Sequence, residues 1–318
     1  MAFIISFFNS NRKPVAVFVP AILSLLLTLI SIYWFGNYSI ALFVIIPLFM
    51  GLGSAIIYSK NNEVSFKQTM LVGLLTMGLY AVSLVAFAIE GLICIAMAMP
   101  IAVWLVLIGS YLGYKINNRY PNQTTISFLI LASLAPVADY MEPEAIPEQI
   151  AVTTSITINA NPDRVWNNLI AFPKMEKPDE FIFKTGIAYP IQSTIVGQGK
   201  GAIRYCAFNT GSFVEPITTW DEPRLLAFNV LEQPEPMVEL SMWDINAPHL
   251  HDYFVSQKGQ FKLTQLSGGK TLLEGTTWYY HRIRPAAYWK LWSTYIIHKI
   301  HHRVLNHIKN NSETVILP

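Results

Sequence analysis

The chain has little cysteine and, in its first half, little charge of either sign. Its two cysteines, Cys94 and Cys206, show no metal-binding or redox spacing, and this count and placement exclude a disulfide framework. Residues 1–150 hold only six of the 22 lysines and arginines, and the formal net charge is +2. A charge this small gives no indication of a nucleic-acid partner. The uneven distribution predicts that the two halves of the chain lie in different solvents.

Long apolar runs account for the scarcity of charge in the first half. A bilayer core about 30 Å thick takes about 20 apolar residues to cross as a helix, and four runs reach that length: 15–34, 39–58, 69–88 and 91–112. A shorter fifth run, 124–138, is interpreted as a further span, with a re-entrant or interfacial helix as the alternatives. We therefore predict a transmembrane region of four to five helices over residues 1–138, in which glycines such as Gly51, Gly73 and Gly78 let helices approach closely.

Basic residues next to the runs predict the orientation in the cell membrane. All the basic segments fall on one side of the predicted spans, and the other side carries Glu90 and the acidic stretch 139–148; the basic residues are Arg12, Lys13, Lys60, Lys67, Lys115 and Arg119. Because lysine and arginine are enriched in cytoplasmic loops, we expect a cytoplasmic N-terminus. If the fifth run crosses the bilayer, the second half is extracytoplasmic; otherwise it is cytoplasmic. The middle of each span lacks ionisable residues, which argues against a transporter.

The second half reads as an acidic linker with two prolines (139–150), a soluble domain (151–311) and a short tail (312–318). Alternating β-branched residues predict a first strand at 152–158, and Asn161 and Pro162 begin a helix. Turn residues separate the later strands, expected at 193–196, 201–208, 212–220, 225–231, 254–266 and 271–282. A long amphipathic helix, 285–310, closes the domain with a stripe of Ile297, Ile300, Val304 and Ile308. The predicted fold class is thus an all-α transmembrane region followed by an α+β domain, with an antiparallel sheet curved around a long C-terminal helix.

Three phrases in this half resemble a known superfamily. TTSITINANPDRVWNNLIAFP is similar to the opening of the START-like helix-grip superfamily (SRPBCC; the polyketide cyclase/dehydrase and lipid transport group). WDEPRLLAFNV resembles its "W-x-x-P-x-x-L-x-F" strand pair, and GKTLLEGTTWYYHR resembles its last hairpin. The resemblance covers residues 151–311 and implies a hydrophobic ligand under the last helix. It implies no universal catalytic set, so no catalytic residue is carried over.

Charged residues among aromatics are the first candidates for a binding site. Alternation places Arg204 on one strand face with Cys206 and Phe208, and Glu274 on one face with Trp278 and Tyr280. A charge in such surroundings needs a partner, so an ion pair of Arg204 with Glu215 or Glu274 is favoured. The alternative is that Arg204 anchors the anionic or carbonyl head of a ligand.

Aromatic and histidine side chains complete the candidate site. Trp292 and Tyr295 on the last helix suit the wall of an apolar cavity. Trp243 lies in a long proline-rich segment that is either a lid or membrane contact, or a loop packed on the sheet. His298 and His302, with His249 or His251, have spacings that zinc sites use, but Lys299 replaces the glutamate of a zinc-protease helix. We therefore expect polar pocket lining, with no metal and no cofactor.

The sequence favours a membrane-anchored binding protein for a lipid or other hydrophobic small molecule. Its partners are then the lipid bilayer and that ligand, and the sequence indicates no particular protein partner. One alternative is a cyclase or hydrolase that uses His249, Tyr280 or Glu274 as acid or base. Another is a membrane assembly or sensor protein whose cavity is filled by its own tryptophan and tyrosine side chains.

Overall fold

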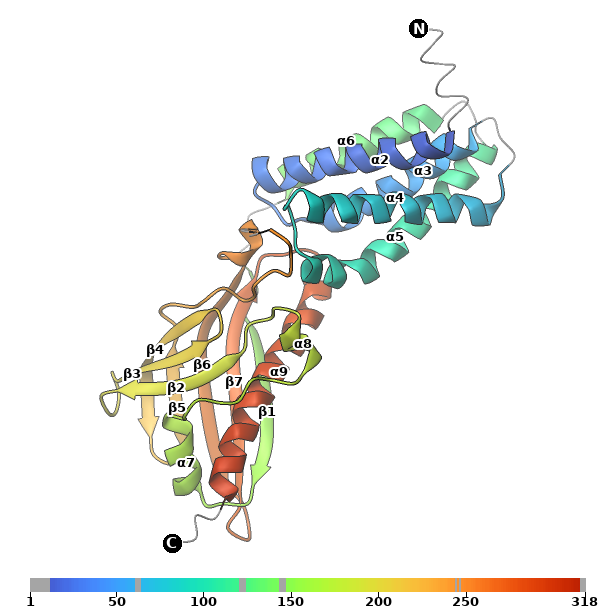
Figure 1. Cartoon of the computed structure of the whole chain (residues 1–318). Coiled ribbons are helices and arrows are strands. Elements are labelled where there is room, and N and C mark those ends of the chain that lie inside the picture. The colour runs from blue at the N-terminus through green and yellow to red at the C-terminus, as the bar shows by residue number, and fades with distance from the viewer. Residues whose placement is uncertain are drawn as a thin grey trace. The chain divides into compact units, whose positions relative to one another are not determined.

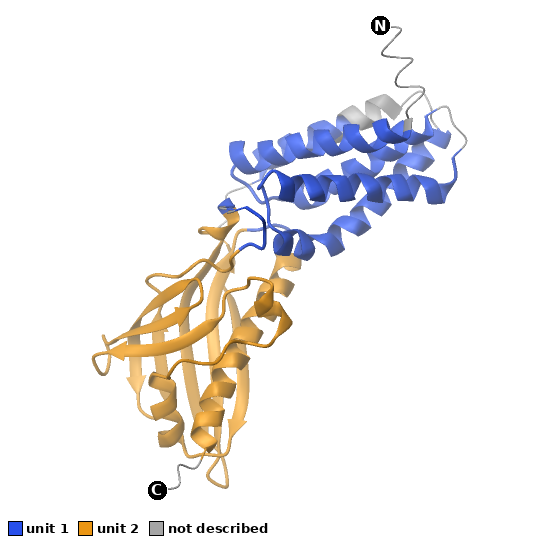
Figure 2. Ribbon diagram, viewed as in Figure 1, with its two compact units in different colours: residues 1–145, 239–248, 283–285 blue, residues 146–238, 249–282, 286–318 orange. Residues whose placement is uncertain are grey.

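The computed structural model describes residues 12–60, 64–119, 124–142, 147–243, 245 and 247–314. The chain forms two compact units, which Figure 2 colours separately. Unit 1 comprises Met1–Ala145, Glu239–Pro248 and Ile283–Pro285, and unit 2 comprises Ile146–Val238, His249–Arg282 and Ala286–Pro318. Two short segments from the second half of the chain therefore belong to the same unit as the first half.

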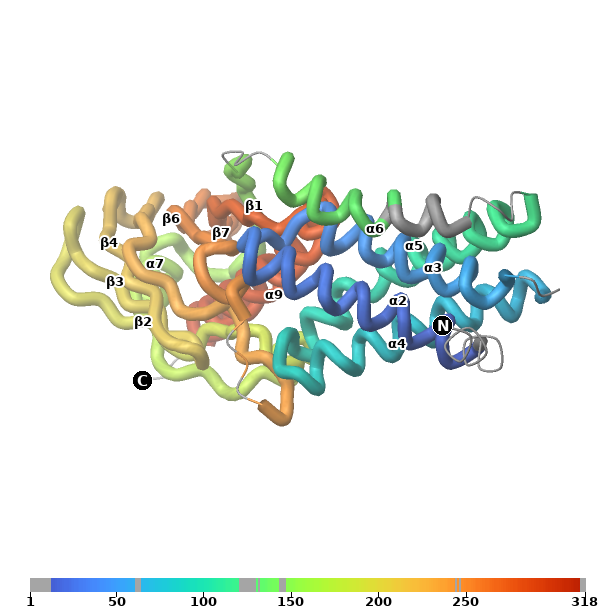
Figure 3. Tube along the Cα trace, turned by 90° about the horizontal axis from the view of Figure 1, so that it is seen from above, coloured from blue at the N-terminus to red at the C-terminus, as the bar shows by residue number. Residues whose placement is uncertain are grey.

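Unit 1 is a bundle of long apolar helices (Figure 1). They are α2 (Arg12–Leu29), α3 (Ile46–Ser59), α4 (Phe66–Ala86), α5 (Leu92–Arg119) and α6 (Thr124–Met141). The π-helical turns η1 (Ile30–Trp34) and η2 (Ala41–Ile45) extend α2 at its end and α3 at its start. Figure 3 shows α2 beside α4 and α3 beside α6. In the described part of the chain, four helical segments are long and apolar enough to cross a membrane: Lys13–Trp34, Ala41–Ser59, Phe66–Ala86 and Leu92–Arg119.

Two of these helices run further than the sequence predicts. The helix α5 continues to Arg119, so Lys115 and Arg119 lie in its last turns rather than in a loop. The helix α6 includes residues 139–141, which the sequence analysis placed in the acidic linker. Buried Asp139 accepts hydrogen bonds from the hydroxyls of Ser31 and Ser39, and these bonds hold the last turn of α6 to the bundle.

Glycines bring α3 and α5 together. A Cβ atom at Gly51 would overlap the carbonyl oxygen of Val106, and one at Gly109 would overlap that of Leu48. Without side chains at these positions the two backbones touch, which is how small residues let membrane helices pack. The prediction of close approach holds for Gly51 and is wrong for Gly78, around which no described atom lies within 4 Å of the Cβ position.

Unit 2 is an antiparallel sheet of seven strands in the order β1-β7-β6-β5-β4-β3-β2. The strands are β1 (Ile150–Ile158), β2 (Pro190–Val196), β3 (Ile203–Phe208), β4 (Gly211–Asp221), β5 (Leu225–Asn229), β6 (Phe254–Gln265) and β7 (Thr271–His281). Gly268 and Gly269 have φ of 74° and 70°, which the tight turn between β6 and β7 requires and which glycine adopts without strain. The predicted strands and their antiparallel arrangement are thus observed.

One face of the sheet curves around the helices (Figure 1). Asn161 caps α7 (Pro162–Ile170) by accepting a hydrogen bond from the Arg164 N–H at 3.0 Å; α8 (Phe181–Lys184) and α9 (Ala286–Glu313) follow. The core beneath α9 contains Val304, Leu305 and Ile308 packed against sheet residues such as Leu273. Ile297 packs in a second cluster with Ile150, Val152 and Tyr279. The predicted stripe on α9 is correct except that Ile300 is only half-buried, and fully buried Leu305 joins it.

Candidate functional site

A buried ion pair lies on the face of the sheet that curves around α9. Arg204 on β3 and Glu215 on β4 are direct cross-strand neighbours, and the Arg204 Nη1 donates to Glu215 Oε2. Their side chains are 2% and 8% exposed. Because cross-strand partners point to the same face, the register alone brings the two charges together. The favoured prediction, an Arg204–Glu215 pair, is observed, and the alternative pairing with Glu274 is wrong.

Aromatic rings surround the guanidinium. The Arg204 Cζ lies 5.9 Å from the ring centre of Phe172, 5.4 Å from that of Phe228 and 5.6 Å from that of Phe261. Burial lowers the pKa of Arg204, but the Glu215 carboxylate and Cys206 outweigh it, so this pKa lies above its ordinary value. Arg204 is therefore a permanent cation in an apolar setting, and contact with ring faces stabilises it further.

Cys206 and Ser193 extend this polar group along the same face. They are cross-strand partners on β3 and β2, and both are buried. We call Arg204, Glu215, Cys206 and Ser193 the inner polar cluster. Burial raises the pKa of the Cys206 thiol to about 12, so the group stays neutral and is no activated nucleophile. The backbone of Phe172 bonds to that of Ser193 in both directions, at 3.0 and 3.1 Å, which fixes this ring beside the cluster.

Some buried polar atoms of this core have unused hydrogen-bonding capacity. Arg204 Nε, Ser193 Oγ and, on α7, Trp166 Nε1 have no hydrogen-bond partner among the described residues. The three residues are 2%, 1% and 0% exposed. A buried donor without an acceptor costs about 1–3 kcal/mol, so native proteins rarely leave one without a reason. A ligand with an oxygen acceptor would satisfy the Arg204 Nε–H.

A second polar group lies between α9 and the strands β1 and β7. Thr154 Oγ1 is 2.7 Å from His298 Nδ1 and 3.0 Å from His301 Nδ1, and Thr277 Oγ1 is 2.8 Å from His301 Nε2. Burial, followed by the charges of His298 and His302, lowers the pKa of His301 to about 3, so its ring is neutral at physiological pH. The predicted partner of His298 was His302, but His302 is exposed, and the residue that shares Thr154 with His298 is His301.

Three predicted binding residues lie on the opposite face of β7. Residues 273, 275, 277 and 279 face α9. Thr277 bonds to His301 and Tyr279 bonds to Ser293, and Leu273 belongs to the core beneath α9. Alternation therefore points Glu274, Trp278 and Tyr280 away from α9. Trp278 contacts the Lys258 ammonium at 4.9 Å and Tyr280 the Arg282 guanidinium at 5.7 Å. The structure thus separates these three residues from the inner polar cluster.

The other predicted residues are also apart from the inner polar cluster. Tyr295 on α9 is 46% exposed and its ring contacts Lys299 at 5.7 Å, and Trp292 is half-buried. Trp243 is 53% exposed and lies in the segment Glu239–Pro248, which belongs to unit 1. His249 is buried in the short helix η4 (Pro248–Leu250).

Sequence reasoning missed Ser193, Phe172 and the role of His301. Ser193 follows an irregularity in the pairing of β2 with β3, so simple alternation says little about its partner. Phe172 lies after α7 in a segment without periodicity. The sequence did contain a signal for His301. It lies three residues after His298, and residues three apart share a helix face just as residues four apart do.

The chain is similar to several solved structures at low sequence identity. Norcoclaurine synthase from Thalictrum flavum is 12% identical, with a TM-score of 0.35, and the match covers 55% of this chain and 99% of that chain. The Zhui aromatase/cyclase from Streptomyces sp. R1128 is 15% identical, with a TM-score of 0.32, over 52% of this chain and 96% of that chain. A protein from Nitrosospira multiformis is 17% identical, with a TM-score of 0.33, over 52% and 97%. No curated protein matches the chain.

The seven-stranded antiparallel sheet closed by one long C-terminal helix defines a helix-grip domain. Residues 149–266 match the model of the family described as polyketide cyclase / dehydrase and lipid transport. The C-terminal domain is a START-like domain of this kind, as its sequence motifs indicate. The apolar helices of unit 1 lie outside the match.

Proposed function

We propose that this protein is a membrane-anchored binding protein for a lipid or other apolar small molecule that carries a carbonyl or hydroxyl group. The observation that carries the proposal is the environment of the Arg204 guanidinium. Its guanidinium is buried among three phenylalanine rings and paired with Glu215, and its Nε–H has no acceptor among the described residues. An apolar wall with a few placed polar groups is the usual composition of a small-molecule site.

The ion pair favours a neutral ligand over an anion. Glu215 already balances the charge of Arg204, so a ligand carboxylate would bring a second negative charge into the same buried region, where like charges repel strongly. A carbonyl or hydroxyl oxygen accepts the Nε–H without that cost. The sequence left an anionic and a carbonyl head open, and the pairing supports the carbonyl.

The apolar helices supply the anchor in this proposal. The basic residues at one end of the helices favour a cytoplasmic N-terminus. A crossing by α6 would then place the binding domain outside the cytoplasm, which a reporter fused after residue 150 tests. Ligand exchange with the bilayer is a natural consequence of tethering such a domain to it.

The enzyme alternative requires an acid and a base that point into one site, and the structure gives no support for such a pair. Acid–base catalysis requires the acid and the base within hydrogen-bond reach of one substrate. Two of its three candidates, Glu274 and Tyr280, lie on the face of β7 away from α9, and the inner polar cluster holds none of the three. The binding proposal uses groups that the structure does bring together.

A fluorescent ester provides the test. The full-length chain in nanodiscs is titrated with the methyl ester of a polyene fatty acid, read by energy transfer from tryptophan, because Trp166 and Trp220 lie in the core of the domain. In the variant Arg204→Met/Glu215→Leu both charges are removed, since replacing a buried pair by apolar residues is often neutral for stability while removing one partner costs about 3–5 kcal/mol. Arg224→Met removes an exposed arginine paired with Asp221 and is the matched control.

The wild type and Arg224→Met should bind the ester with equal affinity. The double variant should bind about 10- to 100-fold more weakly, because a hydrogen bond from a charged donor contributes about 1.5–3 kcal/mol. Equal affinity in a folded double variant would make Arg204 and Glu215 a structural pair only. If the wild type gives no saturable energy transfer beyond that of empty nanodiscs, the binding proposal is wrong.

A further inference from the structure

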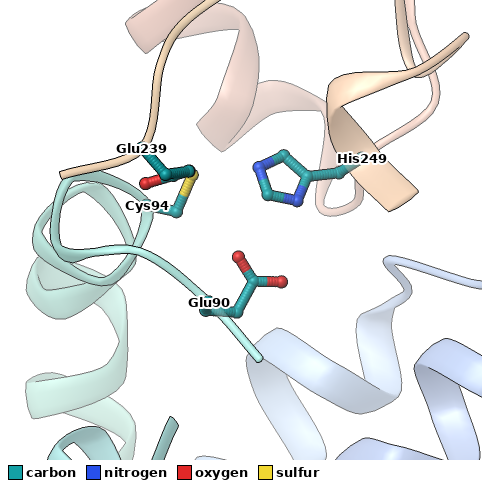
Figure 4. A group of neighbouring side chains, drawn as sticks. All are labelled: Glu90, Cys94, Glu239 and His249. Atoms are coloured by element: carbon teal, nitrogen blue, oxygen red, sulfur yellow. The ribbon is translucent and has the colours of Figure 1, made fainter. Parts of the chain in front are cut away.

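Unit 1 contains a group of side chains that could hold a metal ion. The side chains of Glu90, Cys94 and Glu239 bring two carboxylates and one thiol together, and their ligand atoms all lie within 4.8 Å of one another. Figure 4 shows the side chains of Glu90, Cys94 and Glu239 turned toward one another. We call Glu90, Cys94 and Glu239 the thiol–carboxylate cluster.

The backbone holds this cluster in place. Glu90 lies in the connection between α4 and α5, and Cys94 in the first turn of α5. The Leu92 N–H donates to the Leu240 carbonyl at 3.2 Å, which fixes the segment Glu239–Pro248 against the start of α5. Gly91 gives space for the Glu239 side chain, because a Cβ atom there would overlap its carboxylate. Cys94 Sγ consequently lies 2.6 Å from Glu239 Oε1.

The donors match a transition-metal ion of the zinc class. Zinc binds thiolate sulfur at about 2.3 Å and carboxylate oxygen at about 2.0–2.2 Å, so ligands of one ion lie at most about 4.5 Å apart. A thiolate ligand disfavours calcium and magnesium, which prefer oxygen. Glu90 and Glu239 are 7% and 8% exposed, and a cation relieves the repulsion between buried anions. The Tyr38 hydroxyl donates to Glu90 Oε1 at 2.7 Å, which orients that carboxylate as groups around metal ligands commonly do.

We propose that Glu90, Cys94 and Glu239 bind one divalent transition-metal ion of the zinc class. The Cys94 thiol releases its proton to solvent as the metal–sulfur bond forms, because the thiolate is the ligand. The site ties the segment Glu239–Pro248 to the start of α5. The proposal does not depend on ligand binding by the C-terminal domain, and it differs from the sequence expectation of no metal.

Metal content and a cobalt spectrum test the site. The full-length chain is purified in mild detergent without a polyhistidine tag, stripped with EDTA and titrated with Zn²⁺ or Co²⁺. The wild type should bind one ion per chain, and bound Co²⁺ should show the near-ultraviolet charge-transfer band of a cobalt–thiolate bond. Cys94→Ser should abolish this band. Glu239→Gln should lower the affinity for the metal ion by about 10- to 100-fold or more, because substitution of a residue that merely supports a metal ligand already costs that much. Cys206→Ser, which replaces the other cysteine of the chain, should retain both.

Two of the three contradicting results come from the wild type alone. A folded wild type that binds neither ion, or that binds Co²⁺ without the thiolate band, would overturn the proposal. So would an unchanged band in Cys94→Ser.

Discussion

At the scale of single residues, His301 links the α9–sheet contact to pH. Its ring nitrogens lie 3.0 Å from Thr154 Oγ1 and 2.8 Å from Thr277 Oγ1, and its pKa in the folded protein is lowered to about 3, whereas unfolded histidine titrates at about 6.5. The unfolded chain therefore binds an extra proton between these values. The stabilising effect of neutral His301 is complete above pH 6.5 and is lost as the pH falls toward 3.

We expect His301→Gln to flatten the pH dependence of thermal stability between pH 7 and 4.5. Glutamine keeps hydrogen-bonding groups and does not titrate, and neither do the facing residues Thr154 and Thr277. His298, which also contacts Thr154, is the same in all the proteins compared. Lys290→Gln, at an exposed position of α9, is the control for a substitution in this helix and should melt with the slope of the wild type. Parallel melting curves for the wild type and His301→Gln across this range would remove His301 from the account.

Arg204 shows how far the sequence leads at this scale. Alternation placed Arg204 on one strand face with Cys206 and Phe208, because the side-chain period of a strand is two. It left Glu215 and Glu274 open as partners, since the choice depends on strand order and register, which hairpin geometry decides. The Arg204 Nε–H has no acceptor because phenylalanine rings surround it. These rings come from segments that are distant in the sequence, so no local pattern could predict this.

At the scale of elements, the close packing of α3 against α5 depends on glycine. Gly51→Ala should destabilise the helical unit by about 1–3 kcal/mol, as overpacking does, because the added Cβ meets the Val106 backbone rather than a movable side chain. Gly78→Ala is the matched control, with open space at its Cβ position among the described residues. Thermal unfolding in one detergent compares them. Equal melting temperatures would show that α3 and α5 do not pack through Gly51.

Most helices and strands were predictable because their signals are local. Apolar runs of sufficient length, the Asn161–Pro162 start of α7 and the glycine turn before β7 each determine one element. The residues at which helices end were less predictable. The helix α5 continues through Lys115 to Arg119 because nothing in that sequence breaks a helix, and α6 keeps Asp139 because distant Ser31 and Ser39 bond to it.

At the scale of the whole molecule, the order of the chain and the membership of the units differ. The segments Glu239–Pro248 and Ile283–Pro285 belong to unit 1, although strands of unit 2 flank them. Within unit 1, Arg284 donates its backbone N–H to the Tyr38 carbonyl at 2.9 Å, and its Nε lies 3.0 Å from Glu142 Oε1. The composition shift near residue 139 separates the apolar helices from the rest, but short polar segments such as these carry no composition signal.

The central claim is that the C-terminal domain holds an apolar small molecule through Arg204. Mass spectrometry of small molecules released from the full-length protein, extracted in mild detergent, tests it most directly. The wild type should carry a lipid-like molecule with a carbonyl or hydroxyl group near one per chain, and folded Arg204→Met/Glu215→Leu should carry much less of it than Arg224→Met does. Equal amounts in all three proteins, or bulk membrane lipids alone, would contradict the account.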